Sequence, residues 1–221
     1  MVKVAKDNIF QTLKSRILAG ELSSDAPLKE RDLAEEFGIS RTPVREALRQ
    51  LVSEKLVRIV PNVGAFVGSF SWKDAVEIFA VRKVLEAFAA QLTTPRLAAV
   101  QIADLEKVLK KSELAMQKGD VGGYMKCDEE FHSCLNENCG NQHLTEMIRN
   151  VNDKTKLARL RLSLFQNRES TRLSLKEHKA ILSCLKAKDA AGAGRLVWQH
   201  GQRFYAQVLQ IDSPPAFIQE S

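Results

Sequence analysis

Three histidines and one aspartate of this 221-residue chain have types and spacing that suit a metal ion. Asp128 and His132 are four residues apart, so on a helix the carboxylate and the imidazole lie on one face. His178 and His200 each lie in the middle of a later helical pattern. If the three helices line one cavity, these side chains could hold a transition metal with room for water or a ligand. Spacing alone leaves a second interpretation open, in which they are ordinary core or surface residues.

A second set of residues could contact nucleic acid. Arg41, Arg45 and Arg49 recur every four residues and form one stripe along a predicted helix. Arginine can bridge O6 and N7 of guanine with two hydrogen bonds, and it can also bind phosphate. The alternative is a solvated charged face neutralised by Glu46 and Glu54. The opposite side of the helix is apolar and predicts burial, through Val44, Ala47, Leu48, Leu51 and Val52.

The elements around the arginine stripe favour DNA binding. A helix from about residue 7 ends at Gly20, a second ends at Gly38, and Ser40 is a suitable N-cap for the third. The apolar period then changes to two over 57–60 and 65–67, around a turn at 61–64. Helix, helix–turn–helix and hairpin is the order of a winged helix-turn-helix, in which the wing completes a known docking geometry.

The rest of the chain is predicted to be helical. The expected helices run from Ser71 to about Leu92, from Thr94-Pro95 to about Lys118, then to about Glu137, to about Phe165, over about 170–187, and from Asp189 to about Gln210. Short links between amphipathic helices suggest an antiparallel bundle. The fold class is therefore mainly α, with a DNA-binding domain over 7–68 and an all-α bundle of about six helices over 71–211.

Composition sets the broad class. A net charge of +6 fits an anionic partner, although the placement of the charges matters more than their sum. The four cysteines form no Cys-x-x-Cys pair, so a zinc knuckle is not expected and the thiols should be reduced. The sequence holds no run of about 18 apolar residues and no secretory pattern at its beginning, so we expect a cytoplasmic protein without a membrane partner.

The DNA-binding block resembles the GntR family of bacterial regulators. The resemblance rests on 28–51, with its acidic-Arg pair and the run Ser-Arg-Thr-Pro-Val-Arg-Glu-Ala-Leu, and on the wing sequence 63–67. It implies that Arg31, Arg41, Thr42 and Arg45 meet DNA and that Gly64 lets the wing backbone approach the minor groove. Arg49 is added from helical spacing alone. Lys29 departs from the expectation of a capping Ser or Asp before the second helix.

The second block resembles the effector-binding (FCD) domain of the fatty-acid-responsive branch of that family. The pattern is Asp-x3-His, then Glu-His, then His, and this chain fills every position. The resemblance implies a divalent transition metal, zinc or nickel, held by Asp128, His132, His178 and His200. His143 falls outside the pattern. An open coordination position would favour a small carboxylate as the effector, and Arg82 either reaches that ligand or pairs with Glu86.

The predicted function is a homodimeric, ligand-responsive transcriptional repressor that binds a near-palindromic operator in double-stranded DNA. One alternative is the same regulator without metal, in which the histidines bind the effector directly. The other is a metal-dependent enzyme with Glu129 or Glu130 as a base. A winged DNA-binding head would have no purpose in an enzyme, so we expect no enzymatic activity.

Overall fold

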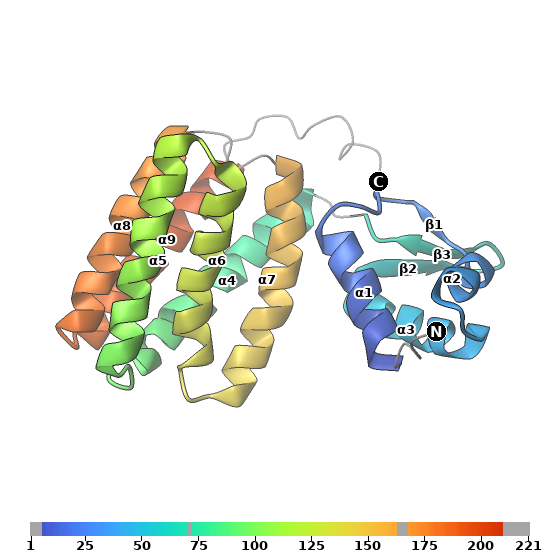
Figure 1. The fold of residues 1–221 in the computed structure, drawn as a ribbon, viewed down its shortest axis with the longest axis horizontal. Coiled ribbons are helices and arrows are strands. Elements are labelled where there is room, and N and C mark those ends of the chain that lie inside the picture. Colours follow the sequence, from blue (N-terminus) through green and yellow to red (C-terminus); the bar gives the residue numbers. More distant parts are fainter. Residues whose placement is uncertain (1–5, 70–71, 163–167, 210–221) are drawn as a thin grey trace.

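The computed structural model describes residues 6–69, 72–162 and 168–209, and it confirms the predicted fold class. A winged head lies beside a helical bundle, with helix α7 of the bundle nearest the head (Figure 1). The elements of the head are α1 (Lys6–Leu18), β1 (Pro27–Leu28), α2 (Glu30–Phe37), α3 (Arg41–Ser53), β2 (Val57–Val60) and β3 (Gly64–Val67).

The head has its own hydrophobic core. Helix α1 contributes Ile9, Leu13 and Ile17, and α3 contributes Val44 and Leu51, all of them buried. Their spacing of four residues on α1 and seven on α3 places them on one stripe of each helix, so α1 and α3 pack face to face. This packing fixes the opposite, polar side of α3 toward solvent.

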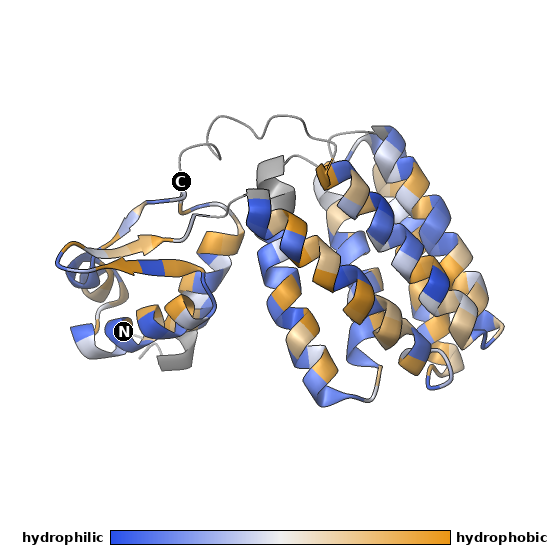
Figure 2. Ribbon diagram, turned by 180° about the vertical axis from the view of Figure 1, so that it is seen from behind, coloured by the Kyte–Doolittle hydropathy of each residue, from blue (hydrophilic) through white to orange (hydrophobic). Residues whose placement is uncertain are grey.

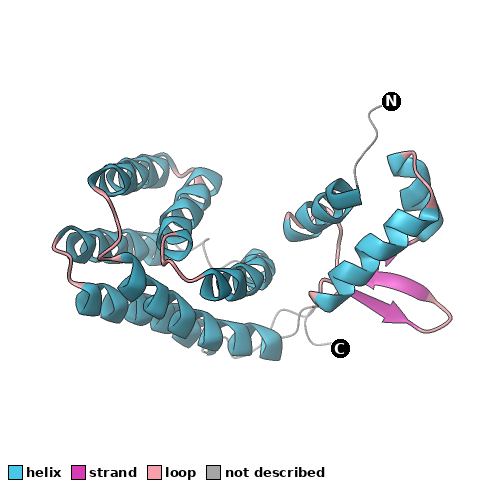
Figure 3. Cartoon of the chain, turned by 90° about the horizontal axis from the view of Figure 1, so that it is seen from below, coloured by secondary structure: helices cyan, strands magenta, loops and turns pink. Residues whose placement is uncertain are grey.

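The wing is part of a three-stranded antiparallel sheet in the order β1-β3-β2. Val57 pairs with Val67 and Val60 with Gly64, while Pro27 pairs with Phe66. Strand β1 was not predicted, because two residues are too few to display a period of two. The β2–β3 hairpin extends away from the bundle (Figure 3).

The bundle consists of long helices with short links. Helix α4 packs mainly against α9, α7 and α6, while α5 packs against α6 and α8. Each helix carries hydrophobic and hydrophilic bands side by side (Figure 2), as expected where one face is buried. The helices are α4 (Trp72–Thr93), α5 (Ala99–Lys118), α6 (Val121–Glu137), α7 (Gln142–Leu162), α8 (Arg168–Lys186) and α9 (Ala190–Leu209).

Two details differ from the expectation. Helix α5 begins at Ala99 and not at Thr94-Pro95, because the N–H of Leu97 bonds to the carbonyl of Thr93 and closes a turn first. Ser40 stands at the N-cap of α3, but its side chain makes no capping hydrogen bond. The predicted helix boundaries at Ser71, Phe165 and Gln210 lie outside the described residues.

Among the residues that the structure describes, no helix is both long enough and apolar enough to span a bilayer.

Candidate metal centre and nucleic-acid interface

The polar side of α3 carries the predicted arginine stripe. Arg41, Thr42, Arg45 and Arg49 are all exposed, while the apolar side of the same helix is buried in the head core. Val52 is only half-buried. The stripe is thus free to meet a partner outside the head.

Arg45 is held by an acidic residue of the preceding helix. Its Nε and Nη2 donate to Oε1 and Oε2 of Glu30 at 2.8 and 2.7 Å. The hydrogen bonds from Arg45 lower the pKa of Glu30, so the carboxylate is ionised at neutral pH. Arg31 lies on α2, is 73% exposed at its side chain, and makes a single 3.2 Å bond to Asp32.

A groove separates α3 from the wing. It has a volume of about 530 Å³ and is lined by Glu30, Arg45 and Arg49 on one side and by Val63 and Gly64 on the other. Gly64 has φ +142°, a conformation that side chains rarely adopt, and a Cβ there would meet nothing within 4 Å. The wing backbone at Gly64 is therefore accessible to a partner.

The four predicted metal ligands come together in the bundle. One ligand atom from each of Asp128, His132, His178 and His200 lies within 4.8 Å of the others, and all four residues are buried. The ring centroids of His132, His178 and His200 are 4.7–5.2 Å apart. Phe131 stacks on His178 with centroids 4.5 Å apart and restrains its ring. Helices α6, α8 and α9 thus converge on one point.

A carboxylate outside the cluster sets the orientation of His200. Nδ1 of His200 lies 2.6 Å from Oε2 of Glu177, and Arg203 bonds the same carboxylate at 2.8 and 2.9 Å. Burial opposes ionisation of Glu177, but hydrogen bonds with His200 and Arg203 outweigh it and lower its pKa to about 2. An ionised carboxylate accepts hydrogen bonds but cannot donate one, so Nδ1 of His200 carries the proton. The lone pair of Nε2 therefore faces the cluster and is available to a metal.

Two of the histidines have the protonation state that a metal requires. Burial lowers the pKa of His132 and of His200 to about 4, so both rings are neutral at pH 7. Both ring nitrogens of His132 and Nε2 of His200 are buried and have no hydrogen-bond partner among the described residues. Buried polar atoms without partners are costly, and a bound cation would satisfy one nitrogen of each ring. The donor set of three imidazoles and one carboxylate therefore fits a divalent transition metal.

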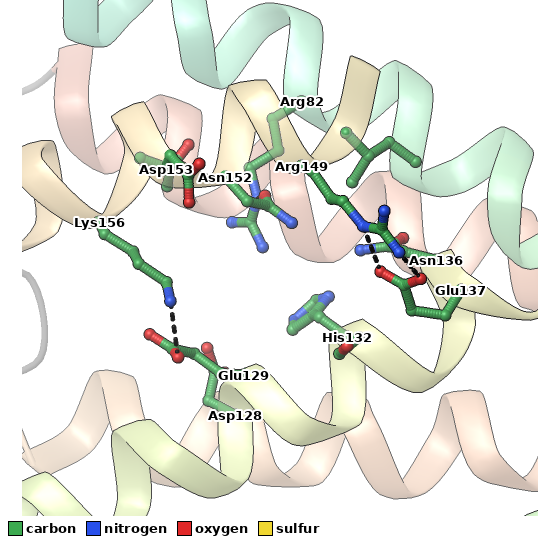
Figure 4. Close-up of a pocket in the computed structure, with 13 residues that line it drawn as sticks. Arg82, Asp128, Glu129, His132, Asn136, Glu137, Arg149, Asn152, Asp153 and Lys156 are labelled. Carbon is green, nitrogen blue, oxygen red and sulfur yellow. Dashed lines mark hydrogen bonds and ion pairs between the residues drawn. The ribbon is translucent and has the colours of Figure 1, made fainter. Parts of the chain in front are cut away.

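Beside the cluster lies a small polar cavity of about 200 Å³ between α6 and α7. Asp128 and His132 form part of its wall, so a ligand in the cavity would reach the cluster. The side chains that line it come from α4, α6 and α7, and most of them are polar (Figure 4). They are Arg82, Asp128, Glu129, His132, Ser133, Asn136, Glu137, Ile148, Arg149, Asn152, Asp153, Thr155 and Lys156.

Arg82 forms the predicted pair with Glu86 and also lines the cavity. It is buried and donates through Nη2 to Glu86 at 2.9 Å and through Nε to Asn152 at 2.8 Å. Glu86 also lies 3.5 Å from Nδ1 of His132. The ion pair thus links α4 to the metal cluster and to α7.

Two ion pairs connect α6 to α7 across the cavity (Figure 4). Lys156 lies 3.0 Å from Glu129, and Arg149 pairs with Glu137 through two nitrogens. Both pairs are partly exposed, so they lie at the rim. A ligand that enters must pass or displace these side chains.

Two contributing residues were not predicted. Glu30 and Glu177 position predicted residues through contacts between different helices, which spacing does not reveal. Glu86 was expected as the partner of Arg82 within α4, but its approach to His132 on α6 was not. Glu177 could have been found from the sequence, because it precedes His178 in the Glu-His pair of the FCD pattern. His143 is exposed and lies outside the cluster.

The head and the bundle meet at Lys14. Its Nζ lies 2.7 Å from Glu54 at the end of α3 and 2.6 Å from Asp153 on α7. Burial opposes charging, but the hydrogen bonds to Asp153 and Glu54 outweigh it and raise the pKa of Lys14. One charged side chain therefore joins α1, α3 and α7.

Sequence comparisons agree with both parts of the structure. Residues 5–67 match the sequence pattern of bacterial regulatory proteins of the gntR family, and residues 77–203 match that of the FCD domain. The HTH-type transcriptional regulator YdhC of Bacillus subtilis is 30% identical over 192 residues, which are 86% of this chain and 85% of YdhC. The gluconate operon transcriptional repressor of B. subtilis is 30% identical over 182 residues, 81% of this chain and 74% of that protein.

A solved structure shows the same architecture. Escherichia coli McbR/YncC superposes with a TM-score of 0.78 at 28% identity, covering 95% of this chain and 99% of the other. The matched patterns and relatives are those of transcriptional regulators and not of enzymes.

Proposed function

This chain belongs to the GntR family of bacterial regulatory proteins and carries an FCD domain, and from that premise we propose that it is a repressor controlled by a small organic acid bound beside a divalent metal. The chain is a DNA-binding transcriptional regulator with an effector-binding domain, and its matched families and relatives are regulators and not enzymes. The proposal divides the chain into a DNA-binding unit over 7–68 and an effector unit over 71–211.

The proposed DNA interface consists of α3, the beginning of α2, and the wing. Arg41, Thr42, Arg45 and Arg49 would enter the major groove, with Arg31 beside them and Gly64 close to the minor groove. The supporting observation is that these residues are exposed while the apolar side of α3 is buried in the head.

The protein would bind as a homodimer to a near-palindromic operator, because two-fold protein symmetry requires two-fold symmetry of the site. Exposed apolar residues on α4 support self-association. Val81, Val84 and Phe88 follow helical spacing and are 48–55% exposed. An apolar stripe of this kind is typical of an interaction surface.

The effector would be a small and strongly polar carboxylate. The cavity of about 200 Å³ is smaller than most drug-sized pockets, and Ile148 is its one aliphatic lining residue, so a long acyl chain is disfavoured. Its lining has four carboxylates and three cationic side chains. A carboxylate ligand would therefore meet a net negative wall in the protein alone, which argues for metal-dependent binding.

Asp128, His132, His178 and His200 would hold the ion, which when bound supplies positive charge and an open coordination position for a carboxylate. Arg82 and Asn152 would fix the ligand from the opposite side of the cavity. The neutral histidines and the proton held on Nδ1 of His200 prepare the donor atoms in advance.

The route from the effector to the DNA would pass through α7. Asp153 both lines the cavity and binds Lys14 of the head, and Asn152 next to it binds Arg82. A ligand that shifts α7 would change the placement of the head through Lys14. It can do so only if it binds the two head placements with different affinity.

The single observation that carries the proposal is the buried convergence of Asp128, His132, His178 and His200 beside a polar cavity. The test is metal analysis of the purified protein, followed by a thermal-shift screen of small carboxylates with and without a chelator. We expect one equivalent of zinc or nickel per chain. A true effector at about 100 times its Kd should add roughly 2.7 kcal/mol to the free energy of unfolding, and only in the metal-loaded protein.

The same measurements distinguish this proposal from the alternative of a regulator without metal. If no metal is found and a carboxylate stabilises the chelator-treated protein equally well, the histidines bind the effector directly. If no carboxylate acts under either condition, the proposed effector class is wrong.

A further inference from the structure

We propose that Glu30 is a positioning residue for base recognition, which holds the guanidinium of Arg45 so that its outer edge faces a guanine. The inference rests on the proposed role of Arg45 in DNA binding and adds a specificity-determining residue from the other helix of the motif. It starts from the two hydrogen bonds, at 2.8 and 2.7 Å, that join the two side chains.

Glu30 binds only one side of the Arg45 guanidinium. A guanidinium has five N–H donors in a planar fork, and Glu30 accepts from one on Nε and one on Nη2. The remaining N–H groups on Nη1 and Nη2 point away along the end of the fork. That end has the donor pair that matches O6 and N7 of guanine. Glu30 therefore uses the side of the guanidinium that a base does not need.

The Glu30–Arg45 pair lies in the groove between α3 and the wing. Glu30 is the first residue of α2, whereas Arg45 lies in the second turn of α3, and both line the groove between α3 and the wing. The side chains are 32% and 54% exposed, and an exposed ion pair contributes little to folding stability. The pair therefore contributes little to the stability of the head.

Glu30 places a negative charge on the proposed DNA-binding surface. A carboxylate on a surface that approaches phosphates opposes binding to any DNA. Arg41 and Arg49 also stabilise the charge of Glu30, so the carboxylate lies beside the arginine stripe of α3. Its presence there reduces affinity for all duplexes, and better discrimination between duplexes would offset that loss.

The pair with Glu30 restricts the side chain of Arg45. Arginine loses considerable side-chain freedom when it is fixed on a base, and a pair formed beforehand reduces that loss. By contrast, Arg31 makes one bond to its sequence neighbour Asp32 and is more exposed. Arg45 is therefore prepared for directional contact, whereas Arg31 suits contact with phosphate.

The experiment uses the full-length protein and a duplex that the wild type selects from a random pool. Dissociation constants are measured for that duplex, for a scrambled duplex, and for versions in which single guanines are replaced by 7-deazaguanine, which lacks N7. The variants are Glu30→Gln, Glu30→Asp, Arg45→Ala and the control Glu35→Gln. Glu35 is an exposed acid on the same helix, so the control removes an equal charge. Thermal unfolding verifies that each variant folds.

The guanine read by Arg45 is the one whose 7-deaza replacement weakens the wild type about tenfold but leaves Arg45→Ala unaffected. At that position we expect Glu30→Gln to lose most of the discrimination, to threefold or less, while its affinity for the scrambled duplex stays equal or rises. Glu30→Asp should be intermediate, because its carboxylate is one methylene shorter, and Glu35→Gln should match the wild type.

Full discrimination in a folded Glu30→Gln protein would overturn the inference. Tighter binding to the selected duplex with undiminished discrimination would also overturn it, since Glu30 would then merely sequester Arg45. If Arg45→Ala retains sensitivity at every guanine, the proposed role of Arg45 itself fails, and that result is distinct from a failure of Glu30.

Discussion

Oε2 of Glu177 on α8 lies 2.6 Å from Nδ1 of His200 on α9, and this contact fixes which nitrogen of His200 faces the metal cluster. Arg203 holds the same carboxylate from the other side. The arrangement resembles the carboxylate–histidine pairs that orient ligands in metal sites, and it connects ligand orientation to the packing of two helices.

Glu177→Gln should weaken metal binding by about 10- to 100-fold, because the amide no longer holds the proton on Nδ1 of His200 as strongly. Competition with a chromogenic chelator measures the affinity. Glu169→Gln, an exposed acid on the same helix, serves as the control and should bind metal normally. Wild-type affinity in a folded Glu177→Gln protein would show that the pair does not support the site.

His178→Ala should lose the metal and blunt the response to effector, yet bind operator DNA without effector as the wild type does. The reason is that His178 belongs to the buried cluster, whereas the DNA interface lies in the head. Elemental analysis and gel shift are the measurements. The exposed His143→Ala is the matched control, and unchanged metal content in His178→Ala would remove this residue from the ligand set.

Arg45→Ala should cost about 1–3 kcal/mol of specific operator binding while leaving dimerisation intact, since a bidentate base contact is worth about that much. Gel shift gives the affinity and sedimentation gives the oligomeric state. Arg203→Ala is no suitable control because it disturbs Glu177, so Lys107→Ala, an exposed cation of α5, is used. Operator binding equal to that of the wild type would contradict the assignment.

Asp153→Asn should uncouple the effector from DNA binding. The substitution removes the charge that Lys14 contacts on α7 but leaves the contact of Lys14 with Glu54 inside the head. We expect the ratio of operator affinities with and without effector to approach one, at a metal content equal to that of the wild type. Glu146→Gln, an exposed acid on the same helix, should keep the wild-type ratio. A full response in Asp153→Asn would exclude Lys14 as the connection.

The order of the helices, the winged head and the arginine stripe could be predicted from the sequence, because they follow from local periodicity. Residues three or four apart on a helix must share a face, so Asp128 with His132, and Arg41 with Arg45, were fixed before any packing. Strand β1 was not predicted, because a two-residue strand shows no period. Helix α5 begins five residues after the predicted start, because the turn that precedes it leaves no periodic signal.

Contacts between distant side chains depend on how the helices pack. His178 and His200 join Asp128 and His132 because α6, α8 and α9 pack together, and no spacing along the chain encodes that convergence. The same holds for Glu30 with Arg45, Glu177 with His200, and Lys14 with Asp153. Each of these contacts depends on the rotation and separation of two helices, which are set by how their buried faces fit and not by the polar residues themselves.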